Sequence, residues 1–260
     1  MAYAFKQKLL GGNDNAQFGY SVALDGYFLA VGSPGERSVY IYGRDISGNW
    51  ESTKRIKYGT SSLFGYAIDI DGVHLAVGVP VTGASGGIAF YTKDQGGFNN
   101  WGLTFYIPSL VGSDFFGSSV SLDFPYCVVG AIASNSWEGA AYIYKFNNNS
   151  WSLFIAAGSN GKILPDVTQV AGDLFGNSVG IRGDYVVVGA RGENNKTGAV
   201  YIYYKNKGGL DSWGLQQRIV ASDVEENDRF GSSVSISGDY IVVGSSYKDL
   251  STGEQNAGSI

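Results

Sequence analysis

The pair Phe-Gly occurs five times in this 260-residue chain, and successive copies lie 46 to 59 residues apart. Each pair is followed by alternating small and apolar residues, a two-residue break and an apolar run that ends in glycine. The five pairs are Phe18-Gly19, Phe64-Gly65, Phe116-Gly117, Phe175-Gly176 and Phe230-Gly231. Repeats of about this length are supersecondary units that bury their apolar faces against neighbouring copies. The chain is therefore expected to fold as one repeat array.

Each repeat predicts a four-stranded antiparallel sheet. The first two runs are separated by turn residues, because Asp-Gly and Gly-Asp adopt positive φ with little strain and favour tight hairpins. The five breaks are Asp25-Gly26, Asp71-Gly72, Phe124-Pro125, Gly183-Asp184 and Gly238-Asp239. A third apolar run follows a variable loop in the first four repeats, and a fourth run begins after a tryptophan at positions 50, 101, 151 and 213.

Sheets of this kind bury both faces when they stack around an axis, which predicts an all-β fold: a β-propeller of five four-stranded antiparallel blades. One domain is expected over residues 1–260, with blades that begin near the five Phe-Gly pairs. The N-terminal strand, residues 3–10, is predicted to complete the last blade and close the ring, because 5–10 matches 215–220. The fifth repeat stops as its third strand begins, so a piece of a longer array is the alternative.

These repeats resemble the FG-GAP repeat, whose best-known members form the propeller of integrin α subunits. The resemblance covers essentially the whole chain and rests on the five Phe-Gly pairs and on the Val-Gly that closes each second strand. It implies a propeller with a role in adhesion or protein binding, at the cell exterior or on a particle surface. Integrin-type blades carry calcium loops resembling D-x-D-x-D-G, which need several carboxylates. The corresponding connection here is a two-residue turn, so the chain resembles a variant with short hairpins and no metal site.

Composition excludes several classes of function. One Cys and one His provide no metal-ligand cluster and no disulfide framework, and no cofactor is expected. A net charge of −5 argues against nucleic acid as a partner, and no apolar run is long enough for membrane insertion. No signal peptide is visible at the N-terminus, and the compartment is left open.

No catalytic residue is predicted. His74 lies in an apolar strand at a position where the other four repeats have Phe or Tyr, so we interpret it as a packing residue. Cys127 is interpreted as a small buried hydrophobe. Since no base–nucleophile pair accompanies either residue, neither predicts catalysis.

Three aspartates, Asp114, Asp173 and Asp228, each precede a Phe-Gly pair by two residues. A carboxylate ring near the axis would suggest a cation site. The favoured interpretation is that each caps the turn that enters the first strand, because Asp side chains bond nearby backbone N–H groups. Arg182-Gly183-Asp184 matches a tripeptide that integrins recognise, but hairpin geometry already accounts for its Gly-Asp.

The outermost strands differ in charge. Three blades carry Lys or Arg there, as exposed sheet edges usually do, and two adjacent blades do not. The uncharged strands contain Phe105, Tyr106, Ile107, Phe154 and Ile155. We hypothesise that they form a docking surface for a protein partner or a second subunit. The alternative is that long neighbouring loops cover them.

The favoured function is a non-catalytic interaction or structural module: a rigid propeller that displays variable loops and an apolar outer edge. Candidate ligand-binding residues in the loops are Trp137, Arg191 and Glu193. A carbohydrate-binding lectin is one alternative, with Trp137 as the side chain best suited to stack on a sugar ring. An enzyme with its site in the central tunnel is the other, although the first strands offer mainly Ser, Ala and Val.

Overall fold

A computed structural model of the protein describes residues 5–59, 63–81, 86–109, 114–154, 162–163, 165, 168–209, 212–248 and 258–260. The fold is almost entirely β. The first blade contains β1 (Ser21–Asp25), β2 (Phe28–Ser33), β3 (Ser38–Arg44) and β4 (Trp50–Lys57). The second contains β5 (Ile68–Asp71), β6 (His74–Val79), β7 (Gly87–Lys93) and β8 (Trp101–Pro108).

The third blade contains β9 (Phe116–Asp123), β10 (Tyr126–Ala131), β11 (Ala140–Asn147) and β12 (Ser150–Leu153), with β13 (Lys162–Ile163) paired to β11. The fourth contains β14 (Phe175–Arg182), β15 (Tyr185–Ala190), β16 (Ala199–Lys205) and β17 (Trp213–Ile219). The fifth consists of β18 (Phe230–Ser237) and β19 (Tyr240–Ser245). Within each blade consecutive strands pair antiparallel, as the hairpin signals predict.

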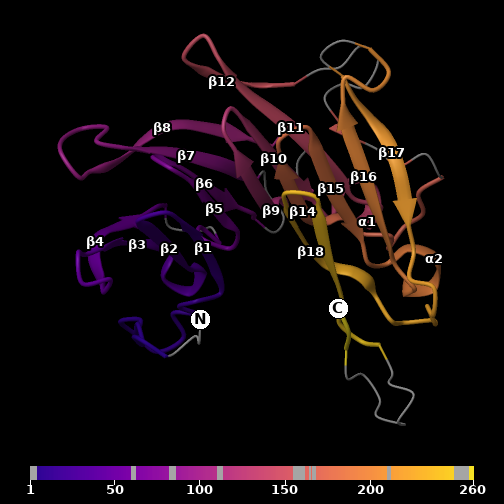
Figure 1. The fold of residues 1–260 in the computed structure, drawn as a ribbon, viewed down its shortest axis with the longest axis horizontal. Coiled ribbons are helices and arrows are strands. Elements are labelled where there is room, and N and C mark those ends of the chain that lie inside the picture. Colours follow the sequence, from indigo (N-terminus) through magenta and orange to yellow (C-terminus); the bar gives the residue numbers. More distant parts are fainter. Residues whose placement is uncertain are drawn as a thin grey trace.

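The blades follow one another around a common centre (Figure 1). The first strand of every blade, from β1 to β18, lies nearest that centre, and the outermost strands β4, β8, β12 and β17 lie at the periphery. This arrangement confirms the predicted all-β propeller architecture.

The N-terminal part of the prediction is wrong. Residues 5–10 form no strand, and residues 3–4 lie outside the described part of the chain. Lys6 Nζ donates to the Ser47 carbonyl at 2.7 Å, and Gln7 exchanges two hydrogen bonds with the backbone of Trp50. These polar side chains therefore attach the segment to the first blade. Among the described residues of the fifth blade, the bridge between Ser245 and Ser259 is the one pairing added to β18 and β19.

The aromatic ring of the Phe-Gly pair supplies the core between blades. Phe64, Phe116 and Phe175 are completely or almost completely buried. Each ring packs among side chains of its own blade and the preceding one, as Phe175 does with Val128 and Ile143. The repeat therefore places a large apolar side chain at the junction between sheets, where burial contributes about 1.5–3 kcal/mol per side chain.

The glycine of each pair enables close contact between blades. All five adopt positive φ, between 84° and 91°, which favours glycine. In the third-to-fourth junction the Gly176 carbonyl oxygen lies over Gly130, where an added methyl group would be only 2.0 Å away. Ser119 Oγ donates to the same carbonyl at 2.8 Å. The first-to-second and fourth-to-fifth junctions have the same serine–carbonyl bond, at 2.7 and 2.9 Å.

The two short helical elements are left-handed turns. In α1 (Ser134–Trp137), Asn135, Ser136 and Trp137 all have positive φ, and in α2 (Glu193–Lys196) Asn194, Asn195 and Lys196 do. Asn tolerates this region better than most residues. Each turn contacts the next blade through its following residue: Phe175 N donates to the Glu138 carbonyl and Phe230 N to the Thr197 carbonyl, both at 2.9 Å. The turns thus tie consecutive blades together.

Candidate functional site

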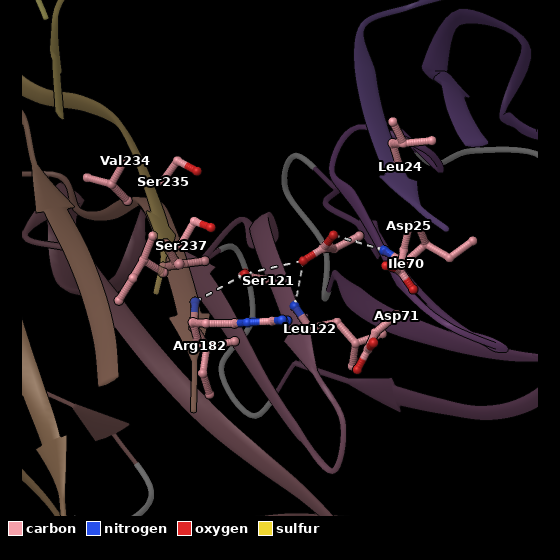
Figure 2. A pocket seen from close by; sticks show the side chains of 15 residues that line it. Leu24, Asp25, Ile70, Asp71, Ser121, Leu122, Arg182, Val234, Ser235 and Ser237 are labelled. Atoms are coloured by element: carbon pink, nitrogen blue, oxygen red, sulfur yellow. Dashed lines mark hydrogen bonds between the residues drawn. The ribbon is translucent and has the colours of Figure 1, made fainter. Parts of the chain in front are cut away.

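The first strands of all five blades line a cavity of about 390 Å³ at the centre of the molecule (Figure 2), which we call the axial funnel. Its lining combines apolar, hydroxyl and charged side chains. The lining residues are Leu24, Asp25, Asp69, Ile70, Asp71, Ser121, Leu122, Val179, Gly180, Ile181, Arg182, Val234, Ser235, Ile236 and Ser237.

Asp69 of β5 is one of the charged residues that line the funnel. Its carboxylate accepts hydrogen bonds from Leu122 N at 2.7 Å, from Ile70 N at 2.9 Å and from Ser121 Oγ at 3.2 Å. Burial raises the pKa of Asp69 to about 6, although these donors act in the opposite direction. Ser121 Oγ also accepts from Ile181 N at 3.2 Å. Figure 2 shows hydrogen bonds that end at the labelled residues Ser121, Leu122 and Ile70, so one chain of hydrogen bonds links the second, third and fourth blades.

Sequence reasoning missed Asp69. The first strands were expected to offer mainly Ser, Ala and Val, and the four positions equivalent to Asp69 are Ala23, Ser121, Gly180 and Ser235. The sequence did contain one indication of this site: a single carboxylate at an inward position where the other four repeats have small residues.

Carboxylates in and beside the funnel hold neighbouring hairpins together. Asp25 accepts from Gly72 N at 2.6 Å, Asp71 from Phe124 N at 2.7 Å, and Asp123 from Gly183 N at 2.6 Å. Each bond joins the end of one first strand to the turn of the next blade. Each of these carboxylates therefore has a structural partner in the next blade.

The tripeptide Arg182-Gly183-Asp184 takes part in the same framework. Arg182 pairs with Asp123 at 3.1 Å, and Asp184 lies 3.5 Å from Lys205 Nζ. Its glycine amide is bonded to Asp123, as described above. All three residues of the triplet thus have contacts that stabilise the hairpin, as its Gly-Asp turn residues indicated.

The predicted structural roles of the isolated residues agree with their surroundings. The His74 ring stacks on Phe124 with centroids 4.0 Å apart, and burial lowers the pKa of His74. Cys127 is completely buried, and burial raises the pKa of its thiol. Both side chains pack against neighbours at the expected strand positions.

The three aspartates that precede Phe-Gly pairs are buried turn caps. Asp114 accepts from Phe116 N at 3.1 Å, Asp173 from Val170 N at 2.8 Å, and Asp228 from Glu225 N at 2.7 Å. None of the three lines the axial funnel. In the described part of the chain, no group of three or more His, Cys, Asp or Glu could hold a metal ion.

The uncharged outer-strand residues differ in how closely they pack against neighbouring side chains. Phe105 and Ile107 pack against the core between the second and third blades, and Phe154 packs against the next core. Tyr106 is 37% exposed and stacks on Tyr58 of the first blade, with ring centroids 5.6 Å apart. Ile155 lies outside the described residues. Neighbouring aromatic side chains thus cover part of this edge.

The candidate loop residues occupy distinct environments. Trp137 is 51% exposed, and its carbonyl accepts from Gly172 N and Leu174 N at 3.1 Å. Arg191 donates its backbone N–H to Asn177 at 3.0 Å. Glu193 is buried, so its carboxylate is not displayed on the surface. It accepts from Tyr201 Oη at 2.5 Å and forms an ion pair with Arg218.

No helix in the described residues is long and apolar enough to cross a membrane. No curated protein sequence matches the chain significantly. Two solved structures share the fold. A protein from Lactobacillus plantarum is 13% identical with a TM-score of 0.53, and the match covers 90% of this chain and 68% of the other. A putative 6-phosphogluconolactonase from Bacteroides fragilis is 12% identical with a TM-score of 0.58, and the match covers 85% and 61%.

This chain therefore spans under two thirds of the length of the Bacteroides protein. The FG-GAP repeat family matches the chain in three segments, residues 111–144, 161–203 and 213–260. Each segment contains one of the last three Phe-Gly pairs. Residues 111–260 thus contain three repeats that match the FG-GAP family, and the first two Phe-Gly pairs lie outside the matched segments.

Proposed function

We propose that this chain is a non-catalytic assembly module that pairs with a second copy of itself through blade faces that its own fold leaves uncovered. The observation that supports the proposal most directly is exposure of apolar side chains at the two ends of the array. Val22 and Leu24 of the first blade are 64% and 63% exposed. Their counterparts in the second blade, Ile68 and Ile70, are 6% and 4% exposed because the first blade covers them.

The last blade has the complementary uncovered face. Val242 is 53% exposed, whereas its counterpart Val187 in the fourth blade is completely buried. Beside it lie Ser233 and Gly244, which correspond to the serine and glycine that receive the carbonyl of the next Phe-Gly pair at earlier junctions. At Gly189 that carbonyl belongs to Gly231, whereas near Gly244 no atom of a following blade is found in the described residues.

Both halves of a blade junction are therefore present on one chain. A hollow of about 470 Å³ surrounds the vacant half and is lined by Ser232, Ser233, Gly244, Ser245, Ser246, Gly258, Ser259 and Ile260. The matching half is the Gly19 carbonyl with Val22 and Leu24. Contact between different faces of two copies is heterologous and forms head-to-tail assemblies.

The mass of the protein in solution tests this function. We expect the weight-average mass to rise above 27.7 kDa as the concentration increases in sedimentation equilibrium. Leu24→Glu and Val242→Glu should each suppress that rise, because each places a charge in the apolar junction. Ile46→Glu is the matched control, since Ile46 is fully exposed in a hairpin of the first blade. A mass of one chain at every concentration, or equal effects of all three variants, would refute the proposal.

A catalytic role in the axial funnel is the second candidate. It is supported by the raised pKa of Asp69, since perturbed carboxylates are common in active sites. One structural neighbour is titled a putative 6-phosphogluconolactonase. Lactone hydrolysis by the wild type and by Asp69→Asn distinguishes the two candidates: activity that depends on Asp69 would favour catalysis over assembly alone.

A further inference from the structure

Three blades share a pair of side chains on adjacent outer strands. A tyrosine on the third strand lies directly opposite a cation on the strand outside it. The pairs are Tyr40 with Arg55, Tyr142 with Lys162, and Tyr201 with Arg218. In each pair the cation lies over the tyrosine ring, at 5.1, 5.7 and 6.0 Å from the ring centre. The second blade differs, because Ala89 lies opposite Tyr106.

In the first and fourth blades a glutamate of the same blade completes the group. Glu36 accepts from Tyr40 Oη at 2.6 Å and pairs with Arg55 at 3.0 Å. Glu193 makes the same two contacts in the fourth blade. Both glutamates are 8% exposed and lie four residues after the glycine that ends the second strand. A buried carboxylate thus lies between a hydroxyl donor and a cation in both blades.

The third blade retains the donors and lacks the carboxylate. The residue at the glutamate position is Ser134, which is 2% exposed. Tyr142 is 1% exposed, and its hydroxyl makes no hydrogen bond of normal geometry among the described residues. Burial raises the pKa of Tyr142 to about 12, and the nearby Ser134 hydroxyl acts in the opposite direction. Lys162 Nζ lies 3.5 Å from Ser134 Oγ. Since the serine oxygen accepts from the lysine, its own proton can be donated either to Tyr142 Oη, which lies beside it, or to a bound acceptor.

Among the described residues, two acidic side chains beside this group have partners of their own. Glu138 accepts from Asn135 Nδ2, and Asp114 accepts from Phe116 N and from Ser109 Oγ. An anion bound here would lie near the negative charge of Asp114, and the fourth blade has the same arrangement of two carboxylates. The equivalent of Asp114 in the fourth blade, Asp173, is close enough to Glu193 for that charge to raise the pKa of Asp173, after the larger effect of burial.

We propose that the third blade binds a small free carboxylate, such as formate or acetate, between Tyr142 Oη, Ser134 Oγ and Lys162 Nζ. The ligand would occupy the position that Glu36 and Glu193 fill in their blades. Three donors and a positive charge match a planar carboxylate, whose two oxygens accept up to four hydrogen bonds. Because Tyr142 and Ser134 are buried, a free carboxylate fits better than the side chain of a partner protein.

The test measures thermal unfolding in increasing sodium formate, with sodium chloride keeping the ionic strength constant. The wild type should show a saturable rise in Tm that chloride alone does not give. Ser134→Glu should raise Tm without formate and abolish the formate response, because its own carboxylate fills the site. Ser152→Glu, at an exposed position of β12, is the control that adds the same charge elsewhere.

Two further variants keep the test informative if Ser134→Glu does not fold. Tyr142→Phe removes one donor and should weaken formate binding about tenfold, as expected for loss of a hydrogen bond to a charged group. Glu193→Ser should create a second formate response in the fourth blade. Equal Tm values in formate and chloride, or an unchanged formate response in both Ser134→Glu and Tyr142→Phe, would overturn the proposal.

Discussion

Gly130→Ala tests the physical basis of the blade junction. The added methyl group would lie 2.0 Å from the Gly176 carbonyl oxygen and 2.2 Å from Ser119 Oγ. Carbon–oxygen contacts are normally about 3.3 Å or longer, so the third and fourth blades would have to separate by roughly 1 Å. Such overpacking costs about 1–3 kcal/mol, and the strained Ser119 hydrogen bond adds about 1 kcal/mol. The lower flexibility of Ala in the unfolded chain offsets about 0.5 kcal/mol.

The expected net loss in the free energy of unfolding is therefore about 1.5–3.5 kcal/mol, measured by urea denaturation. Gly244→Ala provides the matched control at the equivalent position of the last blade. Its methyl group would meet one close atom, Ser233 Oγ, which can rotate away. The free energy of unfolding of this variant should change by less than about 0.5 kcal/mol. Equal losses in the two variants would refute the idea that contact between blades explains the glycine.

Two further predictions concern charged groups. Because the pKa of Asp69 is raised to about 6, the folded state binds more protons than the unfolded state between about pH 4 and pH 6, so stability should fall as pH rises through this range. Asp69→Asn should remove that part of the pH dependence of Tm, and an unchanged profile would contradict it. Arg218→Met should cost about 1–3 kcal/mol in urea denaturation, because it leaves the buried Glu193 carboxylate without its cation. Arg182→Met, which removes a largely exposed cation, should cost less than about 1 kcal/mol.

The repeating parts of the fold could be predicted because local signals coincide with tertiary needs. The Asp-Gly turns fix the hairpins, and the Phe-Gly pair fixes each junction, as the buried Phe116 and Phe175 illustrate. The prediction of an N-terminal strand failed because it rested on local sequence alone. Residues 5–10 have a strand-like sequence, but a strand also needs an available edge, and the polar groups of Lys6 and Gln7 bond the first blade instead.

The sites were harder to predict because they depend on register between distant residues. Glu193 was expected to be a displayed loop residue, yet its position is explained only once Tyr201 and Arg218 are known to lie opposite each other. Ser134 and Lys162 have no distinctive local pattern, and their relation appears only through comparison with the other blades. Asp69 was overlooked because its neighbours in the repeat alignment are small residues.

Cross-linking between two variants, each with one added cysteine, tests the assembly proposal most directly. Ser233→Cys marks the vacant half of the junction and Tyr20→Cys marks the matching half, while the native Cys127 is buried. In the junction between the fourth and fifth blades, the corresponding Ser178 Oγ lies 2.9 Å from the carbonyl of Gly231, the residue before Ser232. After mixing under mild oxidation, mass spectrometry should find the mixed disulfide in clear excess over either homodimer. If it forms no faster than a disulfide from Ser233→Cys to Ile46→Cys, the uncovered faces do not pair.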